Sequence, residues 1–147
     1  MTDLPAPQIL ASLLAPVARA YRRHVDRAFL SLGVSHSLAL PVMLLGRLGD
    51  GVRQGALVEA LGIEPPSLVP LLDQLERASL VERRPDLTDK RAKTLHLTPT
   101  GRELATRAEA AAQDLRAKLM AGIPAADIET TARVLERLRV TLDAAED

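Results

Sequence analysis

Aromatic residues and cysteine are scarce or missing in this chain of 147 residues. Tyr21 and Phe29 are the two aromatic side chains, and there is no tryptophan and no cysteine. Proteins that bind single-stranded nucleic acid stack the bases on aromatic side chains, so this class is disfavoured. Without cysteine the chain can form no disulfide, no thiolate metal site and no thiol redox sensor. A reducing cytoplasmic location is compatible with this composition and is expected.

Net charge and long apolar segments are also lacking. The 19 basic and 19 acidic residues give a formal net charge of +0, so nucleic-acid binding requires a local basic patch. The longest apolar run, Leu38–Leu45, contains Pro41 and is far shorter than the roughly 20 residues that span a bilayer. The N-terminus lacks the features of a signal peptide. We therefore expect one soluble globular domain with no membrane partner.

Hydrophobic periodicity predicts two helices in the first third of the chain. Apolar side chains recur at helical spacing over the first thirty residues, and this amphipathic helix should end near Gly33. A second helix, capped by Ser35, runs to about Leu48 and is apolar on nearly every side, which predicts a central position in the fold. Pro41 should bend this helix modestly.

The last third of the chain predicts two more long helices. Thr98 caps the first of them, which has Pro99 at its first position and ends at Gly122 and Pro124. The second begins at about Ala125 and carries leucines at helical spacing. Each has an apolar side.

The middle of the chain has the pattern of a helix-turn-helix followed by a β-hairpin. After a turn at residues 49–51, two short helical segments, Gly55–Leu61 and about Pro65–Ala78, are separated by a glycine. The period then changes, and Leu80–Arg84 and Lys93–Thr98 are predicted strands joined by a long polar tip. The predicted fold class is therefore mainly α with a small β-hairpin. The apolar side chains expected to pack the two short helices together are Leu57, Leu61, Ile63, Leu68 and Leu71.

The predicted hairpin is basic, although the whole chain is neutral. From residue 77 to residue 93 there are six basic and three acidic side chains, which gives a local charge of +3. In isolation, such a run is most often a solvated surface. Directly after a helix-turn-helix, a basic hairpin can reach the minor groove of DNA while the helix lies in the major groove.

Two stretches resemble the multiple-antibiotic-resistance regulator (MarR) family of transcriptional regulators. LVERRPDLTDKRAKTLHLTPTGREL, residues 80–104, is similar to the wing of that family, and LGIEPPSLVPLLDQLERAS, residues 61–79, is similar to the recognition helix of its SlyA-like branch. The Asp-Lys-Arg-Ala-Lys segment followed by Leu-Thr is a specific signal. The resemblance implies a single winged helix-turn-helix domain over residues 1–147. Its DNA-binding lobe would cover 35–100, between dimerisation helices at 4–34 and 101–145.

The function implied by this resemblance is transcription regulation, by a homodimer that binds a palindromic operator in double-stranded DNA. Arg91 would be the wing-tip arginine that enters the minor groove, and Asp89 would hold it by a charge-assisted hydrogen bond. Ser67, near the start of the recognition helix, would contact base edges or phosphate. The other candidate DNA-binding residues, mainly for phosphate, are Arg77, Arg83, Arg84, Lys93 and His36.

Three positions depart from the family's pattern. Pro70 stands where a basic residue is usual and Gln74 where another is common, so the recognition helix has no positive charge before Arg77. A proline beyond the first turn would bend the helix unless the helix starts later, near Ser67. Ser79 replaces the usual glycine at the helix end, where a left-handed conformation costs serine more. The first two departures lower the expected affinity or shift the operator sequence.

The helices at the two ends of the chain are the predicted dimer interface. One winged helix-turn-helix makes few base contacts, so such proteins bind palindromes as dimers. The apolar faces of residues 4–30 and 101–145 fit this need, and exposure of so many leucines on a monomer would leave an aggregation-prone patch. The alternative is that these faces pack only within the monomer.

A small ligand is the remaining expected partner. By resemblance, an aromatic acid or phenol would release the protein from DNA by binding in a crevice between the dimer helices and the winged lobe. The candidate lining residues are Tyr21, Arg22, His24 and His36. Tyr21 and Arg22 could equally be a core and a solvated residue.

Metal binding and catalysis are not expected. The three histidines lack helical ligand spacing such as i, i+4, and we identify no cofactor site. The sequence also has no nucleophile–base set and no glycine-rich phosphate loop. The competing hypothesis is instead a dimeric helical module that senses a ligand or binds a protein, with weak or lost DNA binding. Pro70 and the uncharged recognition helix motivate it.

Overall fold

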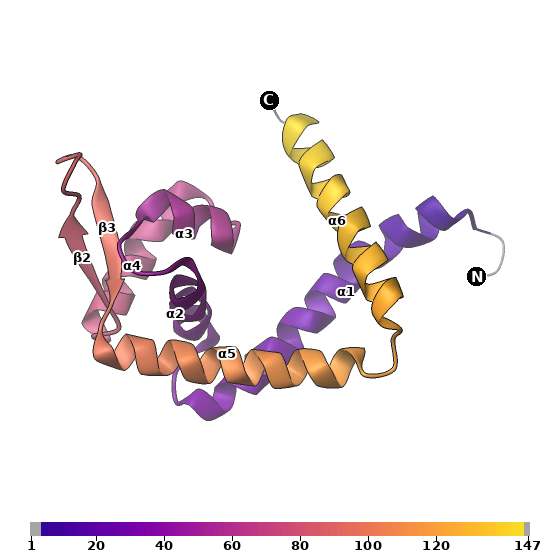
Figure 1. The fold of residues 1–147 in the computed structure, drawn as a ribbon, viewed down its shortest axis with the longest axis horizontal. Helices are drawn as coiled ribbons and strands as arrows, with labels where there is room; N and C mark the ends of the chain where they lie inside the picture. The colour runs from indigo at the N-terminus through magenta and orange to yellow at the C-terminus, as the bar shows by residue number, and fades with distance from the viewer. Residues whose placement is uncertain (1–3, 146–147) are drawn as a thin grey trace. The chain divides into compact units, whose positions relative to one another are not determined.

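The structure, a computed structural model that describes residues 4–145, is mainly helical with a small antiparallel sheet (Figure 1). The chain divides into two compact units, one up to residue 115 and one from residue 116. The first three and last two residues of the predicted domain lie outside the described part. In chain order the elements are α1 (Ala6–Phe29), the 3₁₀ turn η1 (Leu30–Leu32), α2 (His36–Leu48), β1 (Val52–Arg53), α3 (Gln54–Leu61), the 3₁₀ turn η2 (Pro65–Ser67), α4 (Leu68–Arg77), β2 (Val81–Pro85), β3 (Lys93–Leu97), α5 (Pro99–Met120) and α6 (Ala125–Ala145). This order confirms the predicted fold class.

The predicted helix-turn-helix is formed by α3 and α4. Gly62 turns the chain between them with a φ of +62°, in the left-handed region that glycine adopts without strain. Leu57 of α3 and Leu72 and Leu75 of α4 are fully buried in the core of the first unit. Leu71, expected in that core, is only half-buried. Leu71 still packs against that core, and Leu68 is buried as predicted, so the buried face of α4 includes the predicted positions and extends to Leu72 and Leu75.

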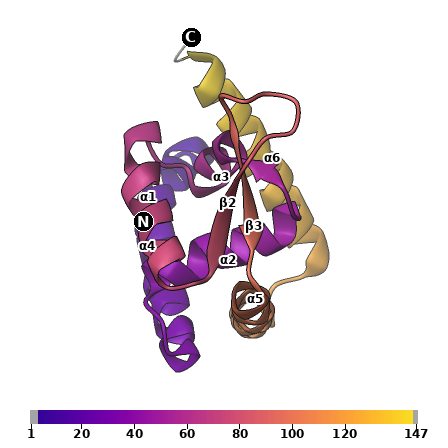
Figure 2. The ribbon, with the colours of Figure 1, turned by 90° about the vertical axis from the view of Figure 1, so that its left-hand side faces the viewer.

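The sheet has three strands, whereas the sequence predicted two. β2 and β3 form the hairpin, with Val81 opposite Leu97, and the short strand β1 pairs with the other edge of β3. β1 has two residues, too few to show the alternation that marks a strand. Figure 2 shows α4 beside β2 and α2 behind the hairpin. The sheet thus joins the wing to the helical core.

Helix α4 starts later than a helix from Pro65 would. The 3₁₀ turn η2 precedes it, and Pro70 is the third residue of α4. Backbone amides of the first turn have no intrahelical acceptor in any case, so a proline is tolerated there. The start near Ser67, one of the two predicted outcomes, is confirmed.

The end of α4 carries a strained serine. Ser79 has a φ of +57°, in the left-handed region that glycine favours. The amide of Ser79 donates to the carbonyl of Glu76 at 2.9 Å and that of Leu80 to the carbonyl of Leu75 at 3.0 Å. These are the two bonds of a Schellman motif. They fix the direction in which the chain leaves α4 and enters β2.

The start of α5 is fixed against the end of this turn. The hydroxyl of Thr98 accepts from the amide of Gly101 at 3.0 Å, which confirms the predicted cap, and donates to the carbonyl of Ser79 at 2.6 Å. A Cβ at residue 101 would lie 2.0 Å from the carbonyl oxygen of Leu80, so only glycine fits. The wing is therefore held at its base by both α4 and α5.

The second unit consists of the end of α5 and the helix α6. No residue of α6, from Ala125 to Ala145, is buried. Among residues 4–145, no single helix is long and apolar enough to cross a membrane.

Candidate nucleic-acid interface

Asp86 organises the loop between β2 and β3. Its carboxylate accepts hydrogen bonds from the amide and hydroxyl of Thr88, both at 2.8 Å, from the amide of Asp89 at 3.1 Å and from Nε of Arg53 at 3.1 Å. The hydrogen bond from the Thr88 amide is the main reason why the pKa of Asp86 lies well below its ordinary value. In the sequence, Asp86 is one of the three acidic residues that lower the local positive charge of the hairpin. In the structure it holds the wing loop in one conformation.

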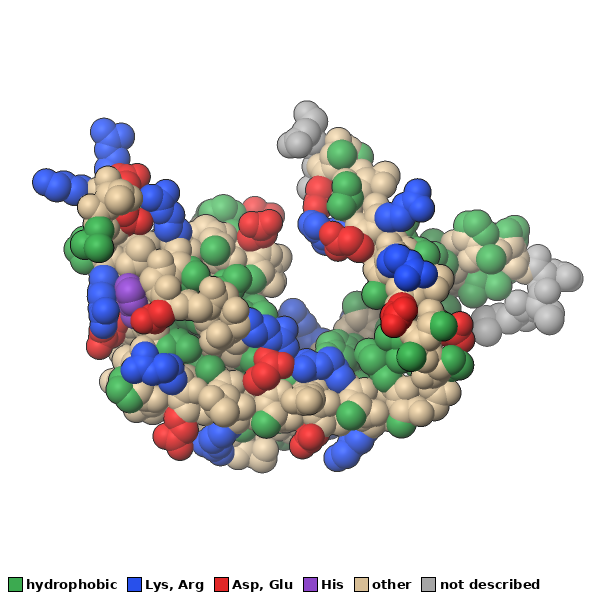
Figure 3. Space-filling view, viewed as in Figure 1, with side chains coloured by type: hydrophobic (Ala, Val, Ile, Leu, Met, Phe, Trp, Pro, Cys, Tyr) green, Lys and Arg blue, Asp and Glu red, His purple; other side chains and the backbone are tan. Residues whose placement is uncertain are grey.

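The cations of the wing lie in this loop and at the start of β3. Lys90, Arg91 and Lys93 are exposed, and Figure 3 shows the basic side chains gathered at the end of the wing. Asp89 accepts a hydrogen bond at 3.0 Å from the backbone amide of Arg91, not from its guanidinium as predicted. The reason is that an aspartate carboxylate readily accepts a hydrogen bond from the backbone amide two residues later, which closes a local turn, whereas a bond to the end of a long side chain requires that side chain to be ordered as well. The Arg91 guanidinium remains available for a ligand.

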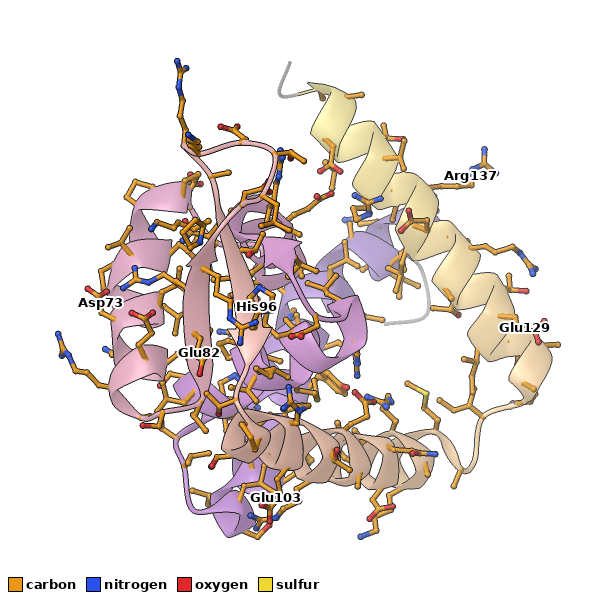
Figure 4. The ribbon with its side chains drawn as sticks, turned by 60° about the vertical axis from the view of Figure 1, so that its left-hand side comes forward. Asp73, Glu82, His96, Glu103, Glu129 and Arg137 are labelled. Atoms are coloured by element: carbon orange, nitrogen blue, oxygen red, sulfur yellow. The ribbon has the colours of Figure 1, made fainter. Side chains whose placement is uncertain are left out.

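Arg83, a predicted phosphate contact, holds β2 against α4. Its Nη2 lies 2.8 Å from a carboxylate oxygen of Asp73 and 2.5 Å from one of Glu76, and Figure 4 shows Asp73 projecting from α4. The hydrogen bond to Glu76 raises the pKa of Arg83, and the same bond lowers the pKa of Glu76. The Arg83 side chain is 26% exposed. Two carboxylates already neutralise its charge, so its geometry favours a structural role.

Arg84 differs from its neighbour Arg83 in exposure. Its Nη2 pairs with a carboxylate oxygen of Glu82 at 2.8 Å, and both side chains are more than half exposed. Such a surface pair is weak and exchanges readily with other partners. Arg84 can therefore still contact phosphate.

The first turns of α4 carry no basic side chain, and its acids Asp73 and Glu76 pair with Arg83. Ser67 precedes the helix and its hydroxyl makes no capping hydrogen bond, so the hydroxyl is free for a base or a phosphate. Val69 is 55% exposed, and Pro70 and Gln74 are exposed as well. Arg77, in the last turn, is the one basic side chain of α4. The first turns of α4 therefore offer small polar and apolar contacts.

His36, predicted for both DNA and ligand, joins α1 to α2. Its Nδ1 lies 2.8 Å from a carboxylate oxygen of Asp26, and its ring stacks on Phe29 with the centroids 5.7 Å apart. Its side chain is 22% exposed. These contacts give His36 a structural role, and a part in binding stays a prediction. His96 of β3 is half-buried, and its Nε2 lies 3.0 Å from the hydroxyl of Thr94.

A cleft of about 660 Å³ lies between α2 and α5 in the first unit. Its walls include Met43, Gly46, Leu97 and Ala105. At the cleft, Arg47 of α2 donates two hydrogen bonds to the carboxylate of Glu109 of α5, at 2.6 and 2.9 Å.

The predicted ligand residues do not line this cleft. Tyr21, Arg22 and His24 are exposed on α1. The pKa of Arg47 is raised, mainly by its hydrogen bond to Glu109, and Tyr21 is near enough to contribute. Sequence analysis missed Arg47 and Glu109. A signal was present, because Arg47 is the one Lys, Arg, Asp or Glu of a helix that is apolar elsewhere from Leu38 onward.

The comparisons with known proteins agree with this architecture. The family model described as MarR family matches residues 40–93. The crystal structure of transcriptional regulator PA3341 is 35% identical in sequence, with a TM-score of 0.83, over 92% of this chain and 98% of that one. The chain belongs to the MarR family. This is a family of transcriptional regulators, not of enzymes; assignment to the SlyA-like branch stays a prediction.

Two further structural neighbours were solved with a partner. CouR from Rhodococcus jostii RHA1, bound to p-coumaroyl-CoA, is 27% identical over 88% of this chain and 90% of that one, with a TM-score of 0.77. A mutant of MarR from E. coli, complexed with operator DNA, has a TM-score of 0.76 over 88% of this chain and 92% of that one. At 23% identity, this second likeness concerns the fold alone.

Proposed function

We propose that this MarR-family regulator acts in the cytoplasm and binds a palindromic operator as a homodimer through a lobe at residues 35–100. Helix α4 would lie in the major groove and the wing in the minor groove. The observation that carries the proposal is the set of exposed cations on the wing, Lys90, Arg91 and Lys93, next to a helix-turn-helix in a neutral chain. A local patch of this kind supplies the attraction to phosphate that the net charge does not.

Each DNA-binding residue has its own expected role. Arg91 enters the minor groove, where narrow A·T-rich segments attract arginine. Ser67 contacts base edges or phosphate in the major groove. Arg77, Arg84 and Lys93 contact phosphates and fix the register without carrying sequence information. Arg83 contributes by holding the wing to α4.

The homodimer would cover apolar faces that each unit leaves exposed. Large exposed apolar side chains occur on α1 (Leu13, Leu14 and Val17) and on α6 (Val134, Leu135, Val140 and Leu142). A second copy that packs on these faces would remove them from water and place two winged lobes on half-sites about one helical turn apart. A double variant, Leu13→Asp with Leu135→Asp, is expected to sediment as a monomer. Leu87→Asp, at a leucine that is 102% exposed on the wing, should remain dimeric; a monomeric wild-type protein would contradict the proposal.

A small aromatic acid or phenol in the cleft between α2 and α5 would release the operator. The apolar walls suit an aromatic ring, and a carboxylate would compete with Glu109 for Arg47. Such a ligand acts only if it binds better to a geometry that does not fit the half-sites. Operator binding titrated with benzoate-type acids should weaken in the wild type and not in Arg47→Gln. The absence of any such response in the wild type would contradict this part of the proposal.

Selection of duplexes from a random library at fixed salt tests the DNA-binding function. We expect a palindromic site to be enriched, and Arg91→Ala to weaken its binding by about 1–3 kcal/mol. Lys118→Ala removes a charge that is also exposed but lies outside the winged lobe, and it should leave binding unchanged. If no palindrome is enriched and Arg91→Ala leaves the residual binding unchanged, a ligand-sensing or protein-binding helical module becomes the better account.

A further inference from the structure

The outer face of α4 combines exposed apolar groups with a lack of basic groups near the helix start. Val69 is 55% exposed, and Pro70 beside it is exposed as well. The first turn of α4, which contains Val69 and Pro70, has no cation, because Arg77 lies in the last turn of the helix. Arg83, on the neighbouring strand, is occupied by Asp73 and Glu76.

This combination favours one kind of base pair over another. Arginine or lysine is the usual partner of the two guanine acceptors in the major groove, and neither is present near the start of α4. The one apolar group on a major-groove base edge is the C5-methyl of thymine, which takes apolar contacts. Gln74, exposed one turn further along α4, can bond bidentately to adenine.

We infer that α4 recognises A·T base pairs through contact of Val69 and Pro70 with thymine methyl groups. The inference rests on the proposed function, since it requires α4 in the major groove. It makes Val69 and Pro70 determinants of sequence specificity, and it explains how a recognition helix with a proline in place of the usual basic residue can still select a site. Removal of one buried methyl group should weaken binding about fourfold, the equivalent of about 0.8 kcal/mol.

Deoxyuridine, which is thymidine without the C5-methyl, tests the inference. Starting from a duplex selected by the wild-type protein, each thymine of one half-site is replaced in turn by deoxyuridine, and the dissociation constant is measured at fixed salt. The wild type should lose about fourfold in affinity at one or two positions of that half-site. Val69→Ala and Pro70→Ala should each bind the thymine duplex more weakly than the wild type does. At those positions, replacement of thymine by deoxyuridine should cost these variants less affinity than it costs the wild type, or none.

Leu87→Ala is the matched control. It removes an exposed apolar side chain from the wing, whose groove contains no methyl group, so this variant should keep the full difference between thymine and deoxyuridine. Both Val69 and Pro70 lie outside the buried core, so their variants should fold.

Two results would overturn the inference alone. One is equal binding of thymine and deoxyuridine duplexes at every position by a wild type that still selects its site. The other is retention of the full difference by both Val69→Ala and Pro70→Ala. Failure of the wild type to select any duplex, which is measured first, would overturn the proposed function and the inference together.

Discussion

The wing and helix α4 are neighbours in the winged lobe, yet they present opposite chemistry to a DNA duplex. The wing carries the exposed cations Lys90, Arg91 and Lys93, the first two on a loop whose amides at Thr88 and Asp89 donate to the carboxylate of Asp86. Helix α4 presents Val69 and other uncharged residues, and has its one cation in its last turn. Contacts to phosphate supply affinity, whereas contacts to base edges supply specificity. In the proposed mode of binding, the two tasks would fall on two different elements.

The comparison also shows why a count of charges misleads. Arg83 and Arg84 are adjacent on β2, but their partners differ. The guanidinium of Arg83 binds two carboxylates, whereas Arg84 forms one exposed ion pair with Glu82. Because side chains alternate along a strand, one faces α4 and the other faces solvent. The cations available to DNA are therefore fewer than the basic residues of the hairpin.

The largest expected effect comes from loss of the loop's organising carboxylate. Asp86→Ala should weaken binding to every duplex by about tenfold, because ordering even one freed loop residue again costs about 1–2 kcal/mol. Hydrogen exchange at the amides of Thr88 and Asp89 should become faster, while the core remains protected. Unchanged affinity with faster exchange would show that the order of the loop does not matter for binding.

Pro70→Arg should remove the difference between the two elements. A basic residue in the first turn of α4 adds a contact to phosphate or to guanine, so affinity for duplex DNA in general should rise several-fold, and the dependence of binding on salt should become steeper. Binding is compared with that of Pro70→Ala, which changes the backbone without adding charge. Equal affinity of the two variants would mean that residue 70 does not face DNA.

Arg83→Ala and Arg84→Ala separate structure from binding. Arg83→Ala should lower the free energy of unfolding by about 1 kcal/mol, because it frees two partly buried carboxylates, without changing the salt dependence of DNA binding. Arg84→Ala should have the reverse effect, with little change in unfolding and a smaller salt slope. Denaturant titration and binding over a salt series measure the two effects.

Acid should affect the wing through the lowered pKa of Asp86. A carboxyl group whose pKa is lower in the folded than in the unfolded chain stabilises the fold above its unfolded value, ordinarily 3.8, and this stabilisation is lost as the pH falls toward the folded value. Glu76, whose pKa is lowered by Arg83, contributes with the same sign. Unfolding at several pH values below 5 should show a weaker dependence on pH in Asp86→Asn than in the wild type.

Elements with local signals could be predicted from the sequence. The cap at Thr98, the turn at Gly62 and the basic hairpin depend on residues within a few positions of each other, and each is where the sequence indicated. The late start of α4 was one of two outcomes that Pro70 allowed.

Features that depend on distant partners could not be predicted. The pair Arg47–Glu109 joins residues 62 positions apart, and the bond from Arg53 to Asp86 joins residues 33 apart. Periodicity describes which face of a helix is apolar, but it does not reveal which carboxylate will neutralise a given arginine. For the same reason the sequence predicts that Arg83 contacts DNA. In the structure its guanidinium instead donates to the carboxylates of Asp73 and Glu76.

The proposal that the wing supplies affinity and α4 supplies specificity is tested most directly by one set of titrations. Binding of the wild type, Lys93→Ala and Val69→Ala to the selected duplex and to a scrambled duplex is measured over a series of salt concentrations. The account predicts that Lys93→Ala weakens both duplexes alike and reduces the salt slope by about 1, whereas Val69→Ala weakens only the selected duplex and leaves the slope unchanged. Equal weakening of both duplexes by Val69→Ala, or a loss confined to the selected duplex in Lys93→Ala, would contradict it.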